Sequence, residues 1–360
     1  MKKIISLLLL LSLLTGLVAC GGGDYAPVPS TDEEARAVMT FEYENEKYEV
    51  RYELYRALFL AHRDELDGGD GDLWTGEDSD GLIDRINGLI ADYAARIFGT
   101  LHLAKRVGID PYSSEFDDLV REYVRLGVEG DGISVSGAGS YEKYLGMLRE
   151  MGLNYSVQDL VIRYSIALEK LGEYYIGTHD DALGTVGGKL DADEEKLREY
   201  YNSDECVRVI RVYLQAAAYT EKRANEIRDE IALKSSATDV SNYAIQFTTS
   251  SFEEIFDGIV IGAHAASDSY AEYTEAAFST GIGETSAVVP INTGSEDGYY
   301  IFYGVEKTDA HFEKNLESIK ESYLDNEIGK LLDEVHDALV GSVKTTTGYY
   351  SIDHSKISME

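Results

Sequence analysis

Apolar residues recur every three or four positions through most of the first half of the chain, which is the period of amphipathic helices. The longest run begins at Leu82 and is closed by Gly108, a residue suited to a helix C-terminus. Ser113 or Ser114 stands at the predicted N-cap of the next helix. The pattern predicts helices over these segments: 51–66, 82–107, 114–123, 140–151, 154–175 and 191–201.

Strand patterns are fewer and lie mostly in the second half. Residues 41–50 alternate bulky and polar side chains, which predicts a short strand or hairpin. Residues 207–214 have the pattern of a buried strand, and they are followed by a predicted helix over 220–233. The link 177–188 is rich in glycine and is predicted to be turn-like, and a further helix is predicted over 312–339.

The first twenty residues have the pattern of a lipoprotein signal. Lys2 and Lys3 precede an apolar run over 4–18 that ends in Leu17-Val18-Ala19-Cys20. The alternative is a single transmembrane anchor, but the run is shorter than the roughly 20 residues that span a bilayer. We therefore expect a signal peptide over 1–19, a lipid on Cys20, and an extracytoplasmic protein anchored to the cell membrane. Residues 20–38 are Gly-, Pro- and acid-rich and are predicted to form a flexible tether.

The net charge limits the classes of partner. The formal charge of −34 repels phosphate backbones, so we expect no nucleic-acid partner, and membrane attachment must come from the lipid. Of the two cysteines, only Cys206 remains once Cys20 carries lipid, so no internal disulfide is expected. Cys206 is predicted to be a small buried apolar residue.

No metal or cofactor is expected. The acidic stretch 67–80 lacks the ligand pattern of an EF-hand because Trp74 occupies a ligand position, and it is predicted to be a solvated loop. The seven histidines show no metal-ligand spacing.

Several segments together resemble the exported parvulin-type peptidyl-prolyl isomerases and foldases, the SurA and PrsA group. In the first half, the likeness rests on the helix end Ala104–Ile109, the turn Met151-Gly152-Leu153 and the acidic helix Leu190–Tyr201. In the second half, it rests on three pieces: the aromatic-anchored helix with Tyr273 and Phe278, the turn Gly283-Glu284-Thr285-Ser286, and the closing hairpin with Gly298–Glu306.

The resemblance implies an α+β protein. It implies a SurA-like all-helical N-terminal domain over 39–203 and a divergent parvulin-like (FKBP-like) antiparallel-sheet domain over 204–308. A C-terminal helix over 309–340 is expected to pack back on the helical domain, and 341–360 is a tail in which a short strand is considered at 349–352. The implied function is that of a membrane-anchored foldase or chaperone for unfolded, newly exported polypeptides.

The resemblance also implies where a proline-binding pocket would lie. The family has one histidine on the first strand and one on the last, and these positions hold Arg211 and Tyr300 here. An arginine cannot serve as both donor and acceptor as a neutral imidazole does. The family's pocket-lining Met and Phe correspond to Ser269 and Tyr273, while Phe278 is kept.

These five residues form the candidate pocket, and no catalytic residue is assigned. Two alternatives to a passive chaperone stay open: an active prolyl cis-trans isomerase with a rebuilt site, and a non-enzymatic surface lipoprotein that binds a fixed partner or ligand.

Overall fold

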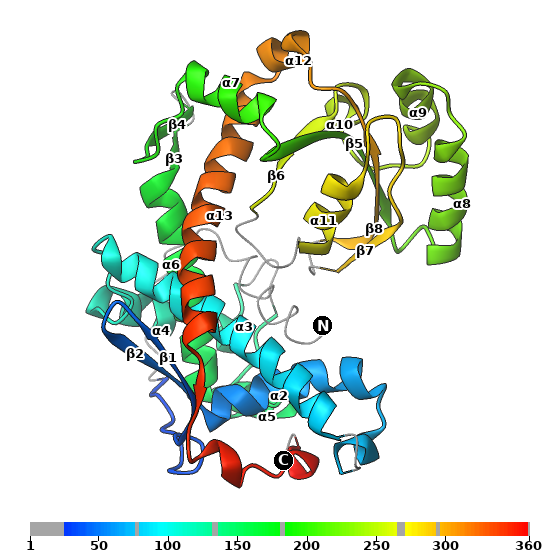
Figure 1. The fold of residues 1–360 in the computed structure, drawn as a ribbon. Helices are drawn as coiled ribbons and strands as arrows, with labels where there is room; N and C mark the ends of the chain where they lie inside the picture. Colours follow the sequence, from blue (N-terminus) through cyan, green and yellow to red (C-terminus); the bar gives the residue numbers. More distant parts are fainter. Residues whose placement is uncertain are drawn as a thin grey trace. The chain divides into compact units, whose positions relative to one another are not determined.

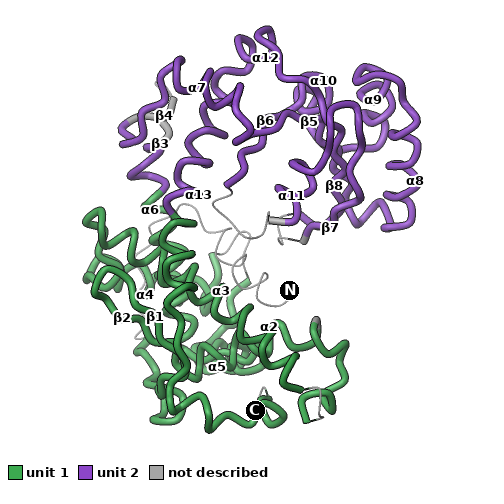
Figure 2. The backbone as a smooth tube through the Cα atoms, in the orientation of Figure 1, with its two compact units in different colours: residues 1–171, 332–360 green, residues 172–331 purple. Residues whose placement is uncertain are grey.

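The computed structural model describes residues 25–75, 79–131, 136–180, 184–264, 271–292 and 296–358. The chain divides into two units, which are Met1–Leu171 with Leu332–Glu360 (unit 1) and Gly172–Leu331 (unit 2), coloured separately in Figure 2. Both divisions fall inside helices, α6 (Tyr155–Tyr175) and α13 (Leu316–Ser342). The predicted domain boundaries at 203/204 and 308/309 differ from these divisions. They concern which parts fold separately, and they stay a prediction. The predicted signal peptide and Cys20 lie outside the described residues.

Unit 1 is built mainly from the predicted helices (Figure 1). The hydroxyl groups of Ser113 and Ser140 accept hydrogen bonds from the backbone N–H three residues on, which satisfies a free donor in the first turn of each helix. Gly108 has a φ of 91°, a value that favours glycine, just beyond the longest helix. The helices are α2 Tyr52–Asp67, α3 Ser79–Arg106, α4 Ser114–Glu129, α5 Tyr141–Glu150 and α6 Tyr155–Tyr175, with a 3-10 turn η1 at Gly71–Trp74.

Unit 1 also contains a small sheet, so the prediction of an all-helical N-terminal domain is wrong. Strands β1 (Ala37–Tyr43) and β2 (Glu46–Arg51) form the predicted hairpin, joined by Glu44 and Asn45 in the left-handed conformation that a two-residue turn requires. A third strand, β9 (Lys344–Thr345), pairs with β1 from the far end of the sequence.

The last part of the chain completes the core of unit 1. Helix α13 (Leu316–Ser342) ends in this unit, where His336 Nε2 lies 2.9 Å from Asp92 Oδ1 of α3. Beyond it, 349–351 forms a 3-10 turn, so the strand considered there is wrong. The side chain of Ile357 is only 3% exposed, and the Tyr349 hydroxyl accepts a 2.6 Å hydrogen bond from Asn87 Nδ2. The tail is therefore a packed part of the unit.

The described part of the predicted tether is also held in place. Glu53 of α2 is 6% exposed and accepts hydrogen bonds from the Ser30 hydroxyl and from Asn154 Nδ2, the latter at 2.7 Å. The guanidinium of Arg36 lies 4.4 Å from the centre of the Tyr52 ring. From Tyr25 onward the segment therefore differs from the flexible chain that its composition predicted, because its few side chains meet specific partners on unit 1.

Unit 2 is built around a four-stranded antiparallel sheet with the order β6-β5-β8-β7. Its strands are β5 Cys206–Gln215, β6 Ile259–Gly262, β7 Val289–Asn292 and β8 Asp297–Gly304. Strand β5 contains the predicted buried strand, and β7 with β8 forms the predicted closing hairpin. The mixture of helices with small antiparallel sheets confirms the α+β class.

Side chains of β5 alternate between two cores on opposite faces of the sheet. Ile210, Val212 and Leu214 pack in one core with residues of α8, α9 and α10, whereas Val209 packs in the other with α11. In Figure 1, α8 and α9 lie on one side of the sheet and α11 on the other. These helices are α8 Glu221–Ala232, α9 Ala237–Ala244, α10 Phe252–Phe256 and α11 Ala271–Ser279.

The remaining elements of unit 2 differ in part from the predictions. The link predicted to be turn-like contains a two-stranded hairpin of β3 (Gly177–Asp180) and β4 (Gly184–Gly187), and α7 (Glu194–Asn202) follows with Asp193 as its N-cap. The single helix predicted over 312–339 is two helices, α12 (Asp309–Lys314) and α13, which are separated at Asn315. Within the described ranges, no helix has the length and apolar character needed to cross a membrane.

The packing of the tail makes the stability of unit 1 depend on pH. His354 Nε2 lies 2.8 Å from the Tyr55 hydroxyl, and burial lowers the pKa of His354, with the nearby charge of Asp353 opposing that shift. Because the pKa is depressed by folding, the neutral ring stabilises unit 1 fully above about pH 6.5, and this contribution is lost as the pH falls.

We expect His354→Gln to remove part of the loss of stability between pH 7.5 and 5.5 in urea unfolding followed by Trp74 fluorescence. His336, whose hydrogen bond to Asp92 raises its pKa, contributes with the opposite sign, so His336→Gln is the matched control. An unchanged pH profile in His354→Gln contradicts the assignment.

Candidate functional site

Three of the predicted pocket residues lie together on the α11 face of the unit 2 sheet. Arg211 comes from β5, Tyr273 from α11 and Tyr300 from β8. The guanidinium carbon of Arg211 lies 5.6 Å from the centre of the Tyr300 ring, and its Nη1 donates a 3.3 Å hydrogen bond to the Tyr273 hydroxyl. The two tyrosine rings meet edge to face, with centroids 5.0 Å apart.

The aromatic side chains of this site are core residues. Tyr300 is 1% exposed and Tyr273 is 6% exposed, and Phe302 and Tyr213 pack against the Tyr300 ring with centroids 6.1 and 4.9 Å away. Burial raises the pKa of both Tyr273 and Tyr300, and Tyr300 donates a 2.7 Å hydrogen bond to Glu296 Oε1. Their rings fill the space between α11 and the sheet.

Arg211 is held by an ion pair with Glu254 of α10. Its Nη2 donates to Glu254 Oε1, and Oε2 of the same carboxylate accepts the Ser251 backbone N–H in a capping box. Burial opposes the charge of Arg211, but the Tyr273 hydroxyl and the Glu254 carboxylate outweigh it, so the pKa of the guanidinium lies above its usual range. Arg211 Nε is buried without a hydrogen-bond partner among the described residues.

The other two predicted residues are placed differently. Phe278, half-buried on α11, packs against the same core as Tyr273 and Tyr300. Ser269 lies outside the described residues, so its prediction is not examined by the structure. The predicted turn lies beside β8: Ser286 Oγ accepts a 2.9 Å hydrogen bond from the Phe302 backbone N–H, and Gly283 has a φ of 79°.

Sequence reasoning missed several residues of this site. Glu254, Glu296 and Tyr213 all contact the predicted residues directly. The Ser251-Phe252-Glu253-Glu254 stretch carries the S-x-x-E signature of a capping box, which is a signal that would have located α10. Glu296 has no comparable signal because its role depends only on the position of β8.

The arrangement brings one cation and a set of aromatic rings together. In the part of the chain that the structure describes, no group of three or more His, Cys, Asp or Glu side chains is placed to hold a metal ion. Cys206 is 1% exposed, as predicted, and burial raises the pKa of its thiol, which donates to the Tyr200 carbonyl at 3.4 Å. A thiol in this state is a poor nucleophile.

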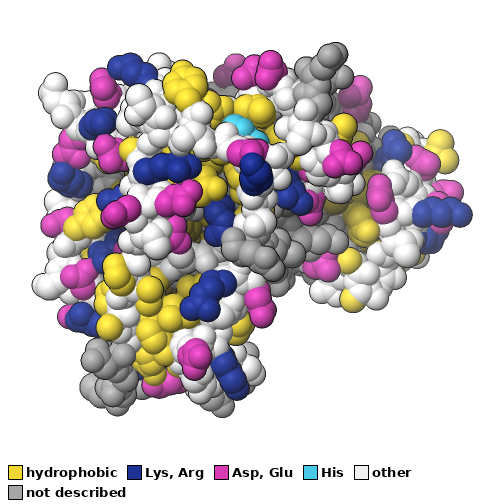
Figure 3. All heavy atoms as spheres, turned by 90° about the horizontal axis from the view of Figure 1, so that it is seen from below, with side chains coloured by type: hydrophobic (Ala, Val, Ile, Leu, Met, Phe, Trp, Pro, Cys, Tyr) yellow, Lys and Arg dark blue, Asp and Glu magenta, His cyan; other side chains and the backbone are white. Residues whose placement is uncertain are grey.

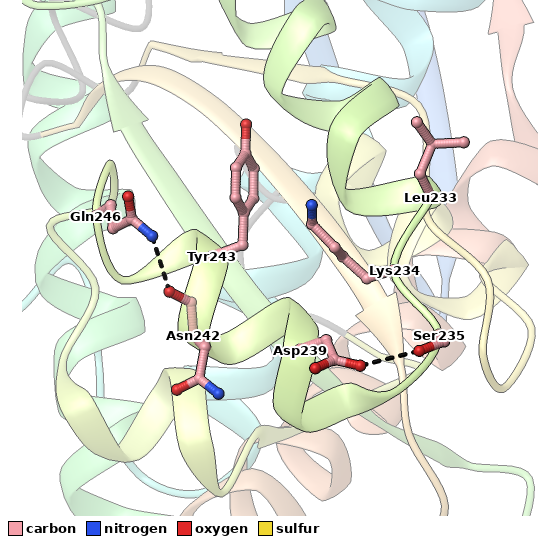
Figure 4. A pocket seen from close by; sticks show the side chains of 7 residues that line it. All are labelled: Leu233, Lys234, Ser235, Asp239, Asn242, Tyr243 and Gln246. Carbon is pink, nitrogen blue, oxygen red and sulfur yellow. Dashed lines mark hydrogen bonds between the residues drawn. The ribbon is translucent and has the colours of Figure 1, made fainter.

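A separate hollow of about 400 Å³ lies at the turn after α8 and along α9 (Figure 4). The Lys234 ammonium lies 4.2 Å from the centre of the Tyr243 ring, and Ser235 Oγ donates a 3.0 Å hydrogen bond to Asp239 Oδ2. None of the residues that line it was predicted to form a site. Their polar groups form hydrogen bonds mainly within the same stretch of chain. The lining residues are Leu233, Lys234, Ser235, Asp239, Asn242, Tyr243 and Gln246.

No family model matches the chain, and no curated protein matches it. Among solved structures, the foldase protein PrsA of Streptococcus pneumoniae is 16% identical, with a TM-score of 0.31 over 69% of this chain and 81% of that one. The chain is similar to PrsA foldases. PrsA of Bacillus subtilis is 13% identical, with a TM-score of 0.25 over 73% and 87%, and PrsA of Lactococcus lactis is 13% identical, with a TM-score of 0.23 over 90% and 99%.

The likeness to the PrsA group predicted from the sequence is therefore confirmed as a likeness. TM-scores this low describe a loose correspondence of folds, so no residue role and no activity of PrsA is carried over to this chain on their account.

Proposed function

We propose that the protein is an extracytoplasmic foldase or chaperone, held at the membrane by lipid on Cys20, that binds unfolded exported polypeptides. One observation carries this proposal. Arg211 and Tyr300, far apart in the sequence and matched to the two histidine positions of parvulins, lie in contact on one face of the unit 2 sheet. Their contact supports a parvulin-like arrangement in which the proline site has been replaced.

The candidate site is filled by its own side chains, which favours peptide binding over catalysis of prolyl isomerisation. Prolyl isomerisation has a barrier of about 18–20 kcal/mol, and an enzyme lowers it by holding the ring in an apolar pocket and stabilising the twisted amide. Here the Tyr273 and Tyr300 rings are packed in the core between α11 and the sheet, and the Arg211 charge is neutralised by Glu254. A passive role therefore fits the described residues better than an active site does.

An exposed aromatic side chain on α10, the helix that supplies Glu254, offers a surface for client segments. Phe252, 63% exposed at the start of α10, stacks on Phe256 with ring centroids 4.3 Å apart. It lies on the same short helix as Glu254, the partner of Arg211. Aromatic rings contribute a large contact area at low entropic cost, which suits weak and broad binding of unfolded chains.

The surface charge fits a protein that stays soluble while it binds such chains. Acidic and basic side chains are interspersed over the face shown in Figure 3, with an overall charge of −34. A large net charge keeps a protein soluble and limits self-association. Client complexes would thus be less prone to associate with one another.

The test is suppression of aggregation of a chemically unfolded reporter protein, followed by light scattering, with the mature chain carrying Cys20→Ala. We expect the protein to delay aggregation and Phe252→Ala to weaken the delay severalfold, because the exposed ring is lost without disturbing a core. Leu233→Ala, 78% exposed on the edge of the α8–α9 hollow, is the matched control. A mature chain that neither delays aggregation nor binds the reporter contradicts the proposed function.

A further inference from the structure

Tyr25 and Ala26, which follow the predicted lipid site, contact α4 and α5 of unit 1. These contacts are called the clasp below. Tyr25 donates a 2.5 Å hydrogen bond to Glu129 Oε1 at the C-terminus of α4, and its ring packs against Tyr141 of α5 with centroids 5.5 Å apart. Tyr141 in turn donates a 2.7 Å hydrogen bond to the Ala26 carbonyl. These three contacts fix where the tether leaves the folded unit.

The segment is also stiff beyond the clasp. The sequence continues Pro27-Val28-Pro29, in which each proline fixes its own φ and restricts the residue before it. Ser30 then bonds to the buried Glu53. The chain is therefore attached at two points, with little freedom between them.

The free length of chain is short compared with the unit. Four residues lie between Cys20 and Tyr25, and the five steps from one Cα to the other span at most about 18 Å when fully extended. A unit of about 200 residues has a radius of gyration of roughly 16 Å and is therefore roughly 40 Å across. A tether shorter than half the unit's width prevents the unit from turning its opposite side to the membrane.

The surface at the clasp suits a lipid headgroup region. Val28 of this segment is 44% exposed and Met147 of α5 is 47% exposed, and the rings of Tyr25 and Tyr141 are partly exposed. Tyrosines are enriched at membrane interfaces, where their rings lie at the headgroup level with the hydroxyl groups in water. The Glu129 carboxylate is paired with Arg125 Nη1 at 2.9 Å, and Arg125 also pairs with Glu122 at 2.6 Å, so its positive charge offsets one of these two carboxylates.

We propose that this clasp surface, made of Tyr25, Val28, Tyr141 and Met147, faces the lipid bilayer and orients unit 1 on it. The inference rests on lipid attachment to Cys20, which is part of the proposed function. The lipid supplies the affinity, and the clasp decides which side of unit 1 meets the headgroups.

The test uses the full-length lipoprotein, reconstituted in phosphatidylcholine vesicles that contain a trace of rhodamine-headgroup lipid. A donor dye is attached through Lys143→Cys, an exposed position on α5, since Cys206 is buried and Cys20 is blocked by lipid. A Gly/Ser insertion of about 20 residues between Gly22 and Gly23 adds about 25 Å of reach, and we expect energy transfer to fall at least about twofold.

A second pair of variants tests the clasp itself. Tyr25→Ala with Tyr141→Ala frees the chain back to Ser30, so transfer should fall in the same direction as with the insertion. Tyr350→Ala, which removes a 78% exposed tyrosine of unit 1, should leave transfer unchanged. Trp74 fluorescence of each variant in solution checks that unit 1 is folded.

The possible outcomes distinguish failure of this inference from failure of the proposed function. If energy transfer changes with neither the insertion nor the clasp variants, in protein shown by mass spectrometry to carry lipid, the proposed orientation is overturned and the proposed function is not affected. If energy transfer depends on the number of protein molecules per vesicle and not on tether length, the clasp surface binds a second copy of the chain. That result also overturns the proposed orientation. Absence of lipid on Cys20 removes the anchoring part of the proposed function, and the orientation falls with it.

Discussion

Changing Tyr300 to Ala is expected to destabilise unit 2 by about 3–5 kcal/mol, the cost of removing a large buried ring from a core. The ring is 1% exposed and packs against Tyr213, Tyr273 and Phe302. Tyr300→Phe keeps the ring and loses only the hydrogen bond to Glu296, so it should cost about 1–2 kcal/mol. Urea unfolding followed by far-ultraviolet circular dichroism measures both variants, while Trp74 fluorescence reports unit 1 separately.

This pair of variants also examines the functional alternative. If Tyr300 lined an open proline pocket, its ring would have solvent on one side, and Tyr300→Ala would cost little more than Tyr300→Phe. NMR exchange between the cis and trans forms of a short X-Pro peptide supplies the second measurement. We expect no acceleration over the uncatalysed rate, and an acceleration abolished by Phe278→Ala would instead establish an isomerase with a rebuilt site.

Much of the architecture was predictable because its signals are local. Periodic apolar residues and the N-cap at Ser113 located helices of unit 1 to within a few residues, except that α4 runs six residues past its predicted end. The alternation in 41–50 located the hairpin of β1 and β2. In unit 2, the contact between Arg211 and Tyr300 was predictable only from the resemblance, since nothing local links two residues on different strands.

Features that depend on a distant partner were missed. Strand β9 has two residues and no pattern of its own, and it exists because β1 offers an unpaired edge. The tail over 349–358 is polar in composition, yet Tyr349, His354 and Ile357 fill gaps beside α2 and α3. A polar sequence is a poor guide to exposure where a few side chains find buried partners.

The acidic stretch 67–80 shows the same effect, and it leads to the second large expected result. Predicted to be a solvated loop, its described part contains Trp74, 4% exposed, whose indole N–H donates a 2.7 Å hydrogen bond to Asp67 Oδ2. Asp67 Oδ1 accepts the Gly69 backbone N–H at 2.7 Å, and its side chain is fully buried. Arg63 Nε lies 3.7 Å from the same carboxylate. Asp67 is therefore the structural centre of this loop.

Asp67→Ala is expected to destabilise unit 1 by about 2–4 kcal/mol, because the buried indole N–H of Trp74 and the Gly69 N–H lose their acceptor and Arg63 loses its buried partner. The figure lies below the full cost of breaking a buried ion pair because the Arg63 side chain is 31% exposed. Asp64→Ala is the matched control: its carboxylate also lies near Arg63 Nε, at 3.6 Å, but is 77% exposed, so its loss should cost at most about 0.5 kcal/mol.

Urea unfolding followed by the fluorescence of the single tryptophan, Trp74, measures both variants and responds to the loss of the indole hydrogen bond itself. Equal costs for Asp67→Ala and Asp64→Ala would mean that the carboxylate is solvated after all. The predicted difference follows from burial, because the two aspartates share a cation and differ chiefly in what else their oxygens bind.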